Sequence, residues 1–78
     1  MNPSIIADLL TELFLRASDE GAPAVRPFFR KTSIEGYRDR HSVLFLVTAY
    51  PNGKFSVGKD SKRFDLDSAV LTITSLFN

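Results

Sequence analysis

The sequence predicts an α+β fold in the order helix, three strands, helix, with a three-stranded antiparallel sheet and both helices on one of its faces. Three observations lead to this fold. Apolar residues recur with helical spacing near the N-terminus, strand-like runs flank an Asn-Gly turn in the middle, and the C-terminal stretch again has an apolar helical face. The 78 residues contain no Cys, so we expect a single domain, 1–78, that folds without disulfides.

The first helix is predicted to run from Pro3 to Ser18. Asn2 is a good N-cap residue and Pro3 suits the first helical position. Gly21 is suited to end the helix in a left-handed conformation. The apolar positions with helical spacing are Ile5, Ile6, Leu9, Leu10, Leu13, Phe14 and Ala17.

Residues 22–27 are predicted to be a connector, followed by a first strand over Phe28–Ile34. Pro27 cannot donate a ladder hydrogen bond, so a strand here either starts at this residue or lies on a sheet edge. The polar residues 35–40 are predicted to form a loop.

The clearest strand pattern covers Ser42–Tyr50, and Asn52-Gly53 then predicts a hairpin turn into a return strand over Phe55–Lys59. Alternation places Leu44 and Leu46 on the face opposite to Val43, Phe45, Val47 and Ala49. Because the helices need one face of the sheet, the two leucines are expected on the other. They are exposed there as a partner surface, unless a loop or long Arg stems cover them.

The C-terminal stretch has two interpretations. A helix over 66–77, capped by Asp65 or Asp67, has an apolar face that includes Ala69 and Ile73. The β-branched residues of 69–74 instead suit a strand. We favour the helix.

The charge distribution is uneven although the net charge is only +1. Residues 26–63 hold nine Lys and Arg against three Asp and Glu, a net charge of +6, whereas both flanking segments are acidic. Such asymmetry indicates either an anion-binding face or a solvated sheet with basic strands that discourage aggregation.

Several functional classes are not expected. One His, no Cys and no Gly-rich phosphate loop offer little to catalysis or metal binding, so we predict neither an enzyme nor a cofactor or metal site. Asp8 and Glu12 interrupt the apolar N-terminal run, so we predict no signal peptide or membrane span and a cytoplasmic location.

Spaced motifs over residues 2–77 resemble those of double-stranded RNA-binding domains, a family with the same element order. The matching residues are Asn2-Pro3 with Leu9, Leu10 and Leu13, then Pro27-x-Phe29, Glu35-Gly36, His41-x-x-x-Phe45-x-Val47, Gly58 and Ser61-Lys62-Arg63, followed by the apolar Ala69, Val70, Ile73 and Phe77. The sequence departs from the family pattern at Asp60, where the second Gly of a Gly-x-Gly is usual.

This resemblance implies binding of duplex RNA, which is read by shape across two minor grooves and the intervening phosphates. It implies three groups of binding residues: Thr11 and Glu12 on the first helix, Arg38, Arg40 and His41 in the loop, and Lys59, Lys62 and Arg63 before the second helix. The stretch Phe64-Asp65-x-Asp67-x-Ala69 is also similar to DNA-binding arm domains of integrases, which makes duplex DNA a second possible ligand.

The alternative function is a small protein-interaction module, such as an adaptor or a phage-like inhibitor. It would bind a protein partner or a second copy of itself through the sheet face that carries Leu44 and Leu46. Neither hypothesis involves a membrane or a small-molecule substrate.

Overall fold

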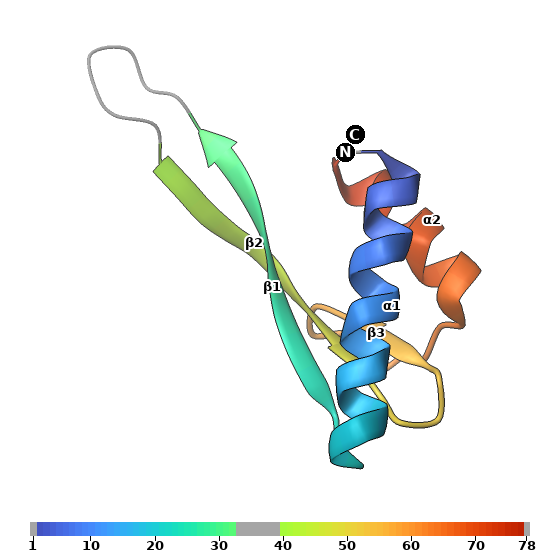
Figure 1. Ribbon diagram of the computed structural model, residues 1–78. Coiled ribbons are helices and arrows are strands. Elements are labelled where there is room, and N and C mark those ends of the chain that lie inside the picture. Colours follow the sequence, from blue (N-terminus) through green and yellow to red (C-terminus); the bar gives the residue numbers. More distant parts are fainter. Residues whose placement is uncertain (1, 33–39, 78) are drawn as a thin grey trace.

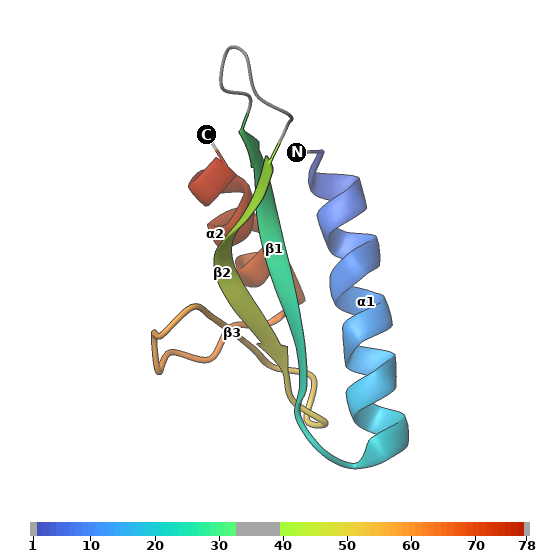
Figure 2. The same cartoon turned by 90° about the vertical axis from the view of Figure 1, so that its left-hand side faces the viewer.

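The computed structural model describes residues 2–32 and 40–77, with side chains described for 2–29 and 43–77. Its elements are α1 (Pro3–Glu20), β1 (Ala24–Thr32), β2 (Arg40–Ala49), β3 (Phe55–Val57) and α2 (Leu66–Phe77). The strands form one antiparallel sheet in the order β1-β2-β3. Both helices lie on the same side of this sheet and contact each other (Figures 1 and 2). The predicted α+β fold is confirmed.

The helix α1 begins and ends where its capping residues require. The Asn2 Oδ1 accepts a hydrogen bond from the Ser4 backbone N–H at 2.8 Å, and Gly21 ends the helix with a φ of 63°. The helix extends two residues beyond the predicted end at Ser18. Its buried residues, Ile6, Leu10, Leu13 and Ala17, all come from the predicted apolar stripe.

The strand β1 starts earlier than predicted. Residues 24–26 pair with residues 47–49 of β2, so the predicted connector over 22–27 is wrong from Ala24 onward. Pro27 lies inside the strand, opposite Leu46, which is tolerated because β1 is an edge strand. Of the predicted end of this strand, residues 33 and 34 lie outside the described residues.

The hairpin after β2 forms at the predicted turn. The Tyr50 N–H donates to the Lys54 carbonyl at 2.8 Å and the Gly53 N–H to the Tyr50 carbonyl at 3.0 Å. The strand β2 begins at Arg40, two residues before the predicted start, and ends at Ala49. The strand β3 ends at Val57 instead of Lys59, because Gly58 adopts a φ of 64° and turns the chain away.

The C-terminal stretch is a helix, so the alternative strand over 69–74 is wrong. The Asp65 carboxylate accepts a hydrogen bond from the Ser68 N–H at 2.9 Å and caps α2. The Thr72 and Thr74 hydroxyls donate to carbonyls four residues earlier, so these β-branched residues are accommodated within the helix. The predicted apolar positions Ala69 and Ile73 are fully buried.

One core lies between the helices and the inner face of the sheet. Its buried members are Ile6, Leu10, Leu13, Ala17, Ala24, Phe28, Val47, Ala49, Phe55, Val57, Ala69 and Ile73. In the described part of the chain, neither helix is long and apolar enough to cross a membrane.

Candidate partner-binding surface

The faces of β2 are set by an irregularity in its pairing with β1. Phe28 lies opposite Phe45, whereas the next residue, Phe29, lies opposite Val43, so Leu44 is an extra residue without a partner. Such a β-bulge reverses the alternation of side chains beyond it. The prediction that Val43 shares the inner face with Phe45 is therefore wrong. Val43 is 56 % exposed, whereas Phe45 packs against the core.

The outer face of the sheet carries a contiguous apolar surface, which we call the outer strip: Val25, Pro27 and Phe29 of β1 and Val43, Leu44 and Leu46 of β2. Pro27 lies opposite Leu46 and Phe29 opposite Val43, a spacing at which side chains touch across strands. Apart from the half-buried Pro27, each member of the outer strip is between 40 % and 56 % exposed. The predicted exposure of Leu44 and Leu46 is confirmed.

The opposite end of the outer face is covered by the chain itself. The Arg63 guanidinium lies over the Tyr50 ring, 4.1 Å from its centroid, and the Tyr50 hydroxyl lies 3.3 Å from the Ser56 Oγ. Ser56 is buried, although it is a small polar residue on a sheet face. The alternative prediction, that a loop or Arg stems cover the leucines, is wrong, because Arg63 lies over Tyr50 and both leucines are exposed.

One edge of β2 is open next to the outer strip. The strand β3 pairs only with Val47–Ala49, and the ladder ends where the Gly58 N–H donates to the Leu46 carbonyl at 2.7 Å. Beyond this bond, no strand of the described part of the chain pairs with β2 on that side. A hollow of about 380 Å³ lies there, lined by Val43, Leu44, Phe45, Leu46, Gly58 and Lys59.

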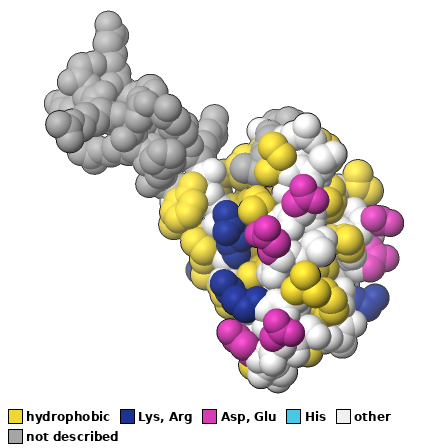
Figure 3. Space-filling view, viewed as in Figure 1, with side chains coloured by type: hydrophobic (Ala, Val, Ile, Leu, Met, Phe, Trp, Pro, Cys, Tyr) yellow, Lys and Arg dark blue, Asp and Glu magenta, His cyan; other side chains and the backbone are white. Residues whose placement is uncertain are grey.

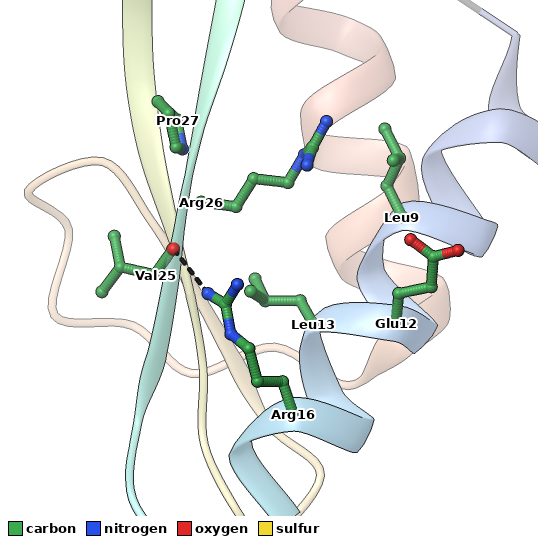
Figure 4. A pocket seen from close by; sticks show the side chains of 7 residues that line it. All are labelled: Leu9, Glu12, Leu13, Arg16, Val25, Arg26 and Pro27. Atoms are coloured by element: carbon green, nitrogen blue, oxygen red, sulfur yellow. Dashed lines mark hydrogen bonds between the residues drawn. The ribbon is translucent and has the colours of Figure 1, made fainter.

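The free edge of β1, in contrast, is blocked. The Arg16 guanidinium on α1 donates a hydrogen bond to the Val25 carbonyl at 2.9 Å, and Pro27 has no N–H to offer (Figure 4). The narrow cleft between α1 and β1 also contains Arg26 and Glu12. In the space-filling view, cationic and acidic side chains are mixed over this region (Figure 3).

The predicted nucleic-acid-binding residues are only partly described. Thr11 and Glu12 are exposed on α1, but the Thr11 hydroxyl donates to the Ala7 carbonyl at 2.8 Å, and Glu12 lines the cleft beside the two arginines. Arg38 lies outside the described residues. Arg40 and His41 belong to β2 rather than to a loop, and their side chains are outside the described set.

Lys59, Lys62 and Arg63 are exposed in the segment between β3 and α2, together with Asp60 and Asp65, and Asp67 follows in the first turn of α2. Residues 59–67 carry three cations and three acids, a net charge of zero. The Asp60 Oδ1 accepts a hydrogen bond from the Lys62 backbone N–H at 3.0 Å, and the Lys62 ammonium lies 5.2 Å from the Phe64 ring centroid.

The N-terminus of α2 is likewise occupied. Hydrogen bonds from Ser68, assisted by the charge of Lys54, lower the pKa of Asp65 below its ordinary value. The Ser68 N–H, one of the donors at the start of α2 that could otherwise bind an anion, therefore already contacts a carboxylate of this chain.

Sequence reasoning found Leu44 and Leu46 but missed Val25, Phe29 and Val43. Alternation along β2 was visible, whereas the bulge and the pairing partners on β1 depend on the folded register. Among the described residues, no three His, Asp or Glu side chains lie together as a metal site.

Comparison of the chain with protein-family models, curated proteins and solved structures gave no match.

Proposed function

We propose that this chain is a protein-interaction module that binds a partner protein through the outer strip. The observation that carries the proposal is the contrast within one sheet face. Four large apolar side chains, those of Phe29, Val43, Leu44 and Leu46, are exposed side by side at one end, and Val25 extends this surface toward the end where the chain covers Tyr50 and Ser56. Contiguous exposed apolar surface on a small protein is typical of an interaction site.

Exposed apolar residues on the helices do not offer a comparable surface. Leu15 on α1 and Leu71 on α2 are exposed, but they lie on elements whose opposite sides form the core. Scattered exposed residues are normal on soluble proteins. The outer strip differs because β-pairing holds its members in fixed register across two strands.

A random peptide library displayed on phage tests the proposal. Peptides selected on the wild-type chain are measured by titration against the double variant Leu44→Ser/Leu46→Ser. A matched control, Leu71→Ser/Leu76→Ser, removes two leucines that are also exposed. We expect the strip variant to weaken binding at least about tenfold, equivalent to about 1.4 kcal/mol, and the control to leave it within about twofold.

Chemical-shift mapping locates the bound peptide. Shifts centred on Phe29 and residues 43–46 support the proposal. Selected peptides that bind the strip variant as tightly as the wild type, or shifts confined to the helices, would overturn it.

A second candidate function is binding of duplex RNA or DNA. It is supported by the exposure of Lys59, Lys62 and Arg63 on one segment, within an α-β-β-β-α topology that is compatible with a double-stranded RNA-binding domain. The three neighbouring carboxylates, Asp60, Asp65 and Asp67, weigh against it because they repel phosphates.

A gel-shift assay with RNA and DNA duplexes of about 20 base pairs tests this candidate, because the known RNA modules span about 16 base pairs. Binding that weakens linearly with the logarithm of salt concentration, and weakens further in Lys59→Ala/Lys62→Ala, supports it. Absence of binding at low salt eliminates it. Arg63 is left unchanged because it packs on Tyr50.

A further inference from the structure

We infer that the open edge of β2 accepts an extended, acidic segment of another protein as an added strand. The inference rests on the proposed function and specifies the chemistry of its partner. It concerns the edge from Val43 to Leu46 and the hollow beside it.

The free edge of β1 and the part of β2 that β3 leaves unpaired differ in how they are protected. Natural sheets block their free edges with proline, charge or covering elements, since unpaired backbone groups attract other strands. The β1 edge has Pro27 and the Arg16 hydrogen bond to the Val25 carbonyl. From Val43 to Phe45, the β2 edge has neither proline nor a charged residue. The open edge is therefore on β2.

The hollow supplies side-chain contacts for such a strand. It lies against the open edge and is lined mostly by apolar residues, with Gly58 turning the chain away at its end. An added strand obtains affinity from main-chain hydrogen bonds and specificity from pockets that receive alternate side chains. An extended segment with apolar residues at alternate positions fits this arrangement.

The positive charge beside the hollow favours an acidic segment as the added strand. Lys59 is exposed, and of the described residues that line the hollow it alone is charged. Opposite charges across adjacent strands stabilise their pairing, whereas like charges destabilise it. Glu or Asp at the outward positions of the added strand would therefore complement this part of the chain.

The same argument disfavours a second copy of the chain. Antiparallel pairing of two β2 edges about Val43 would bring Arg40 of one copy to the register position opposite Leu46 of the other. The Leu46 carbonyl is bonded to Gly58, and Lys59 follows directly. Arg40 of one copy and Lys59 of the other, both positively charged residues, would therefore lie at neighbouring backbone positions at each end of such a pair.

Blocked seven-residue peptides test the inference with the full chain. One peptide alternates Glu and Val, and a second replaces every Glu by Lys. Two further Glu-Val peptides carry N-methyl groups on one or the other alternate set of backbone nitrogens. In an extended strand only one of these sets faces the edge of β2.

We expect the Glu-Val peptide to bind at least about fivefold tighter than the Lys-Val peptide in a titration followed by NMR. Methylation of one alternate set should abolish binding, while methylation of the other set preserves it. Lys59→Glu should reverse the preference between the two charged peptides, and circular dichroism checks that this variant is folded.

Three results of the peptide titrations would overturn the inference. They are tolerance of both methylation patterns, equal binding of the two charged peptides, and absence of binding up to about 1 mM, beyond which the interaction contributes less than about 4 kcal/mol. Sedimentation that shows a dimer through β2 would also overturn it by assigning the edge to a second copy. If library peptides still bind the outer strip in any of these cases, the proposed function stands and only the added strand fails.

Discussion

The two faces of the same sheet differ in how fully they are covered. Val47 and Leu46 are neighbours in β2, yet Val47 is completely buried beneath the helices and Leu46 is 49 % exposed on the other face. All twelve residues of the buried apolar core belong to the helices and the inner side of the sheet. Folding therefore depends on the inner face, and the apolar residues of the outer strip are available for another role.

The outer face also differs between its two ends. Around Tyr50, the segment leading into α2 places Arg63 on the ring and Phe64 in an isolated bridge with Phe55. The Phe55–Phe64 bridge has two backbone hydrogen bonds, both 2.8 Å long. No equivalent element lies over the outer strip in the part of the chain that the structure describes. The chain covers one end of this face and leaves the other for a partner.

Matched Leu→Ala substitutions provide the strongest test of the contrast between faces. Leu10→Ala removes a fully buried side chain from the core and is expected to lower the free energy of unfolding by about 2–5 kcal/mol. Leu46→Ala removes the same atoms from the outer strip and should cost less than about 1 kcal/mol. Urea denaturation followed by circular dichroism measures both.

A milder core substitution covers the case in which Leu10→Ala is unfolded without denaturant. Ile73→Val removes one methylene group from a buried site and should cost about 0.5–1.5 kcal/mol. Equal losses for Leu46→Ala and Leu10→Ala would show that the outer strip is part of the folding core.

Removing Arg63 from the covered end of the outer face should lower the free energy of unfolding by a smaller amount. Arg63→Ala deletes the guanidinium stacked on Tyr50 and should destabilise the protein by about 0.5–1 kcal/mol. Lys62→Ala is the matched control, because its ammonium lies farther from its ring, at 5.2 Å from the centroid of Phe64. Urea denaturation curves of the two variants give the difference between their free energies of unfolding. If Arg63→Ala is no less stable than Lys62→Ala, the stacking does not hold the cover in place.

The sequence predicted the elements better than the faces. Capping residues and turn chemistry act locally, which is why Asn2, Gly21, Asn52-Gly53 and Asp65 marked their boundaries well. The early start of β1 depends on the pairing of Ala24 with Ala49, a contact between distant parts of the chain. The bulge at Leu44 likewise depends on the register between β1 and β2. It places Val43 on the outer face of the sheet instead of the predicted inner face.

The candidate site was predictable to the same extent. Alternation along β2 was enough to predict that Leu44 and Leu46 are exposed. That Val25 and Phe29 also belong to the outer strip follows only from the pairing of β1 with β2. The basic segment was visible in the sequence. Its packing was not, because the contact of Arg63 with Tyr50 follows from the turn at Gly58 and the bridge at Phe64.

We expect a still smaller loss of stability when the protection of the β1 edge by Arg16 is removed. Arg16→Ala removes one exposed hydrogen bond, from the guanidinium to the Val25 carbonyl, and should cost about 0.5 kcal/mol, at the low end for such bonds. Its clearer consequence is a β1 edge that only Pro27 still protects, so we expect concentration-dependent association in light scattering. Arg26→Ala serves as the control, because Arg26 lines the same cleft and its guanidinium lies 5.9 Å from the centroid of the Phe28 ring. Equal association of the two variants would show that Arg16 does not block this edge.

The smallest expected effect is a pH dependence at the start of α2, where the covering segment enters the helix. Hydrogen bonds from Ser68 lower the pKa of Asp65 in the folded protein below the ordinary value of 3.8. The unfolded chain thus takes up the proton first as the pH falls. The stabilisation is present above pH 3.8 and is lost as the pH drops through the lower folded pKa.

Asp65→Asn retains a good cap without the titrating charge. Urea denaturation between about pH 6 and pH 3 should show the wild type losing stability more steeply than Asp65→Asn. Parallel pH profiles would mean that the carboxylate does not hold α2, and with it the covering segment, through its charge.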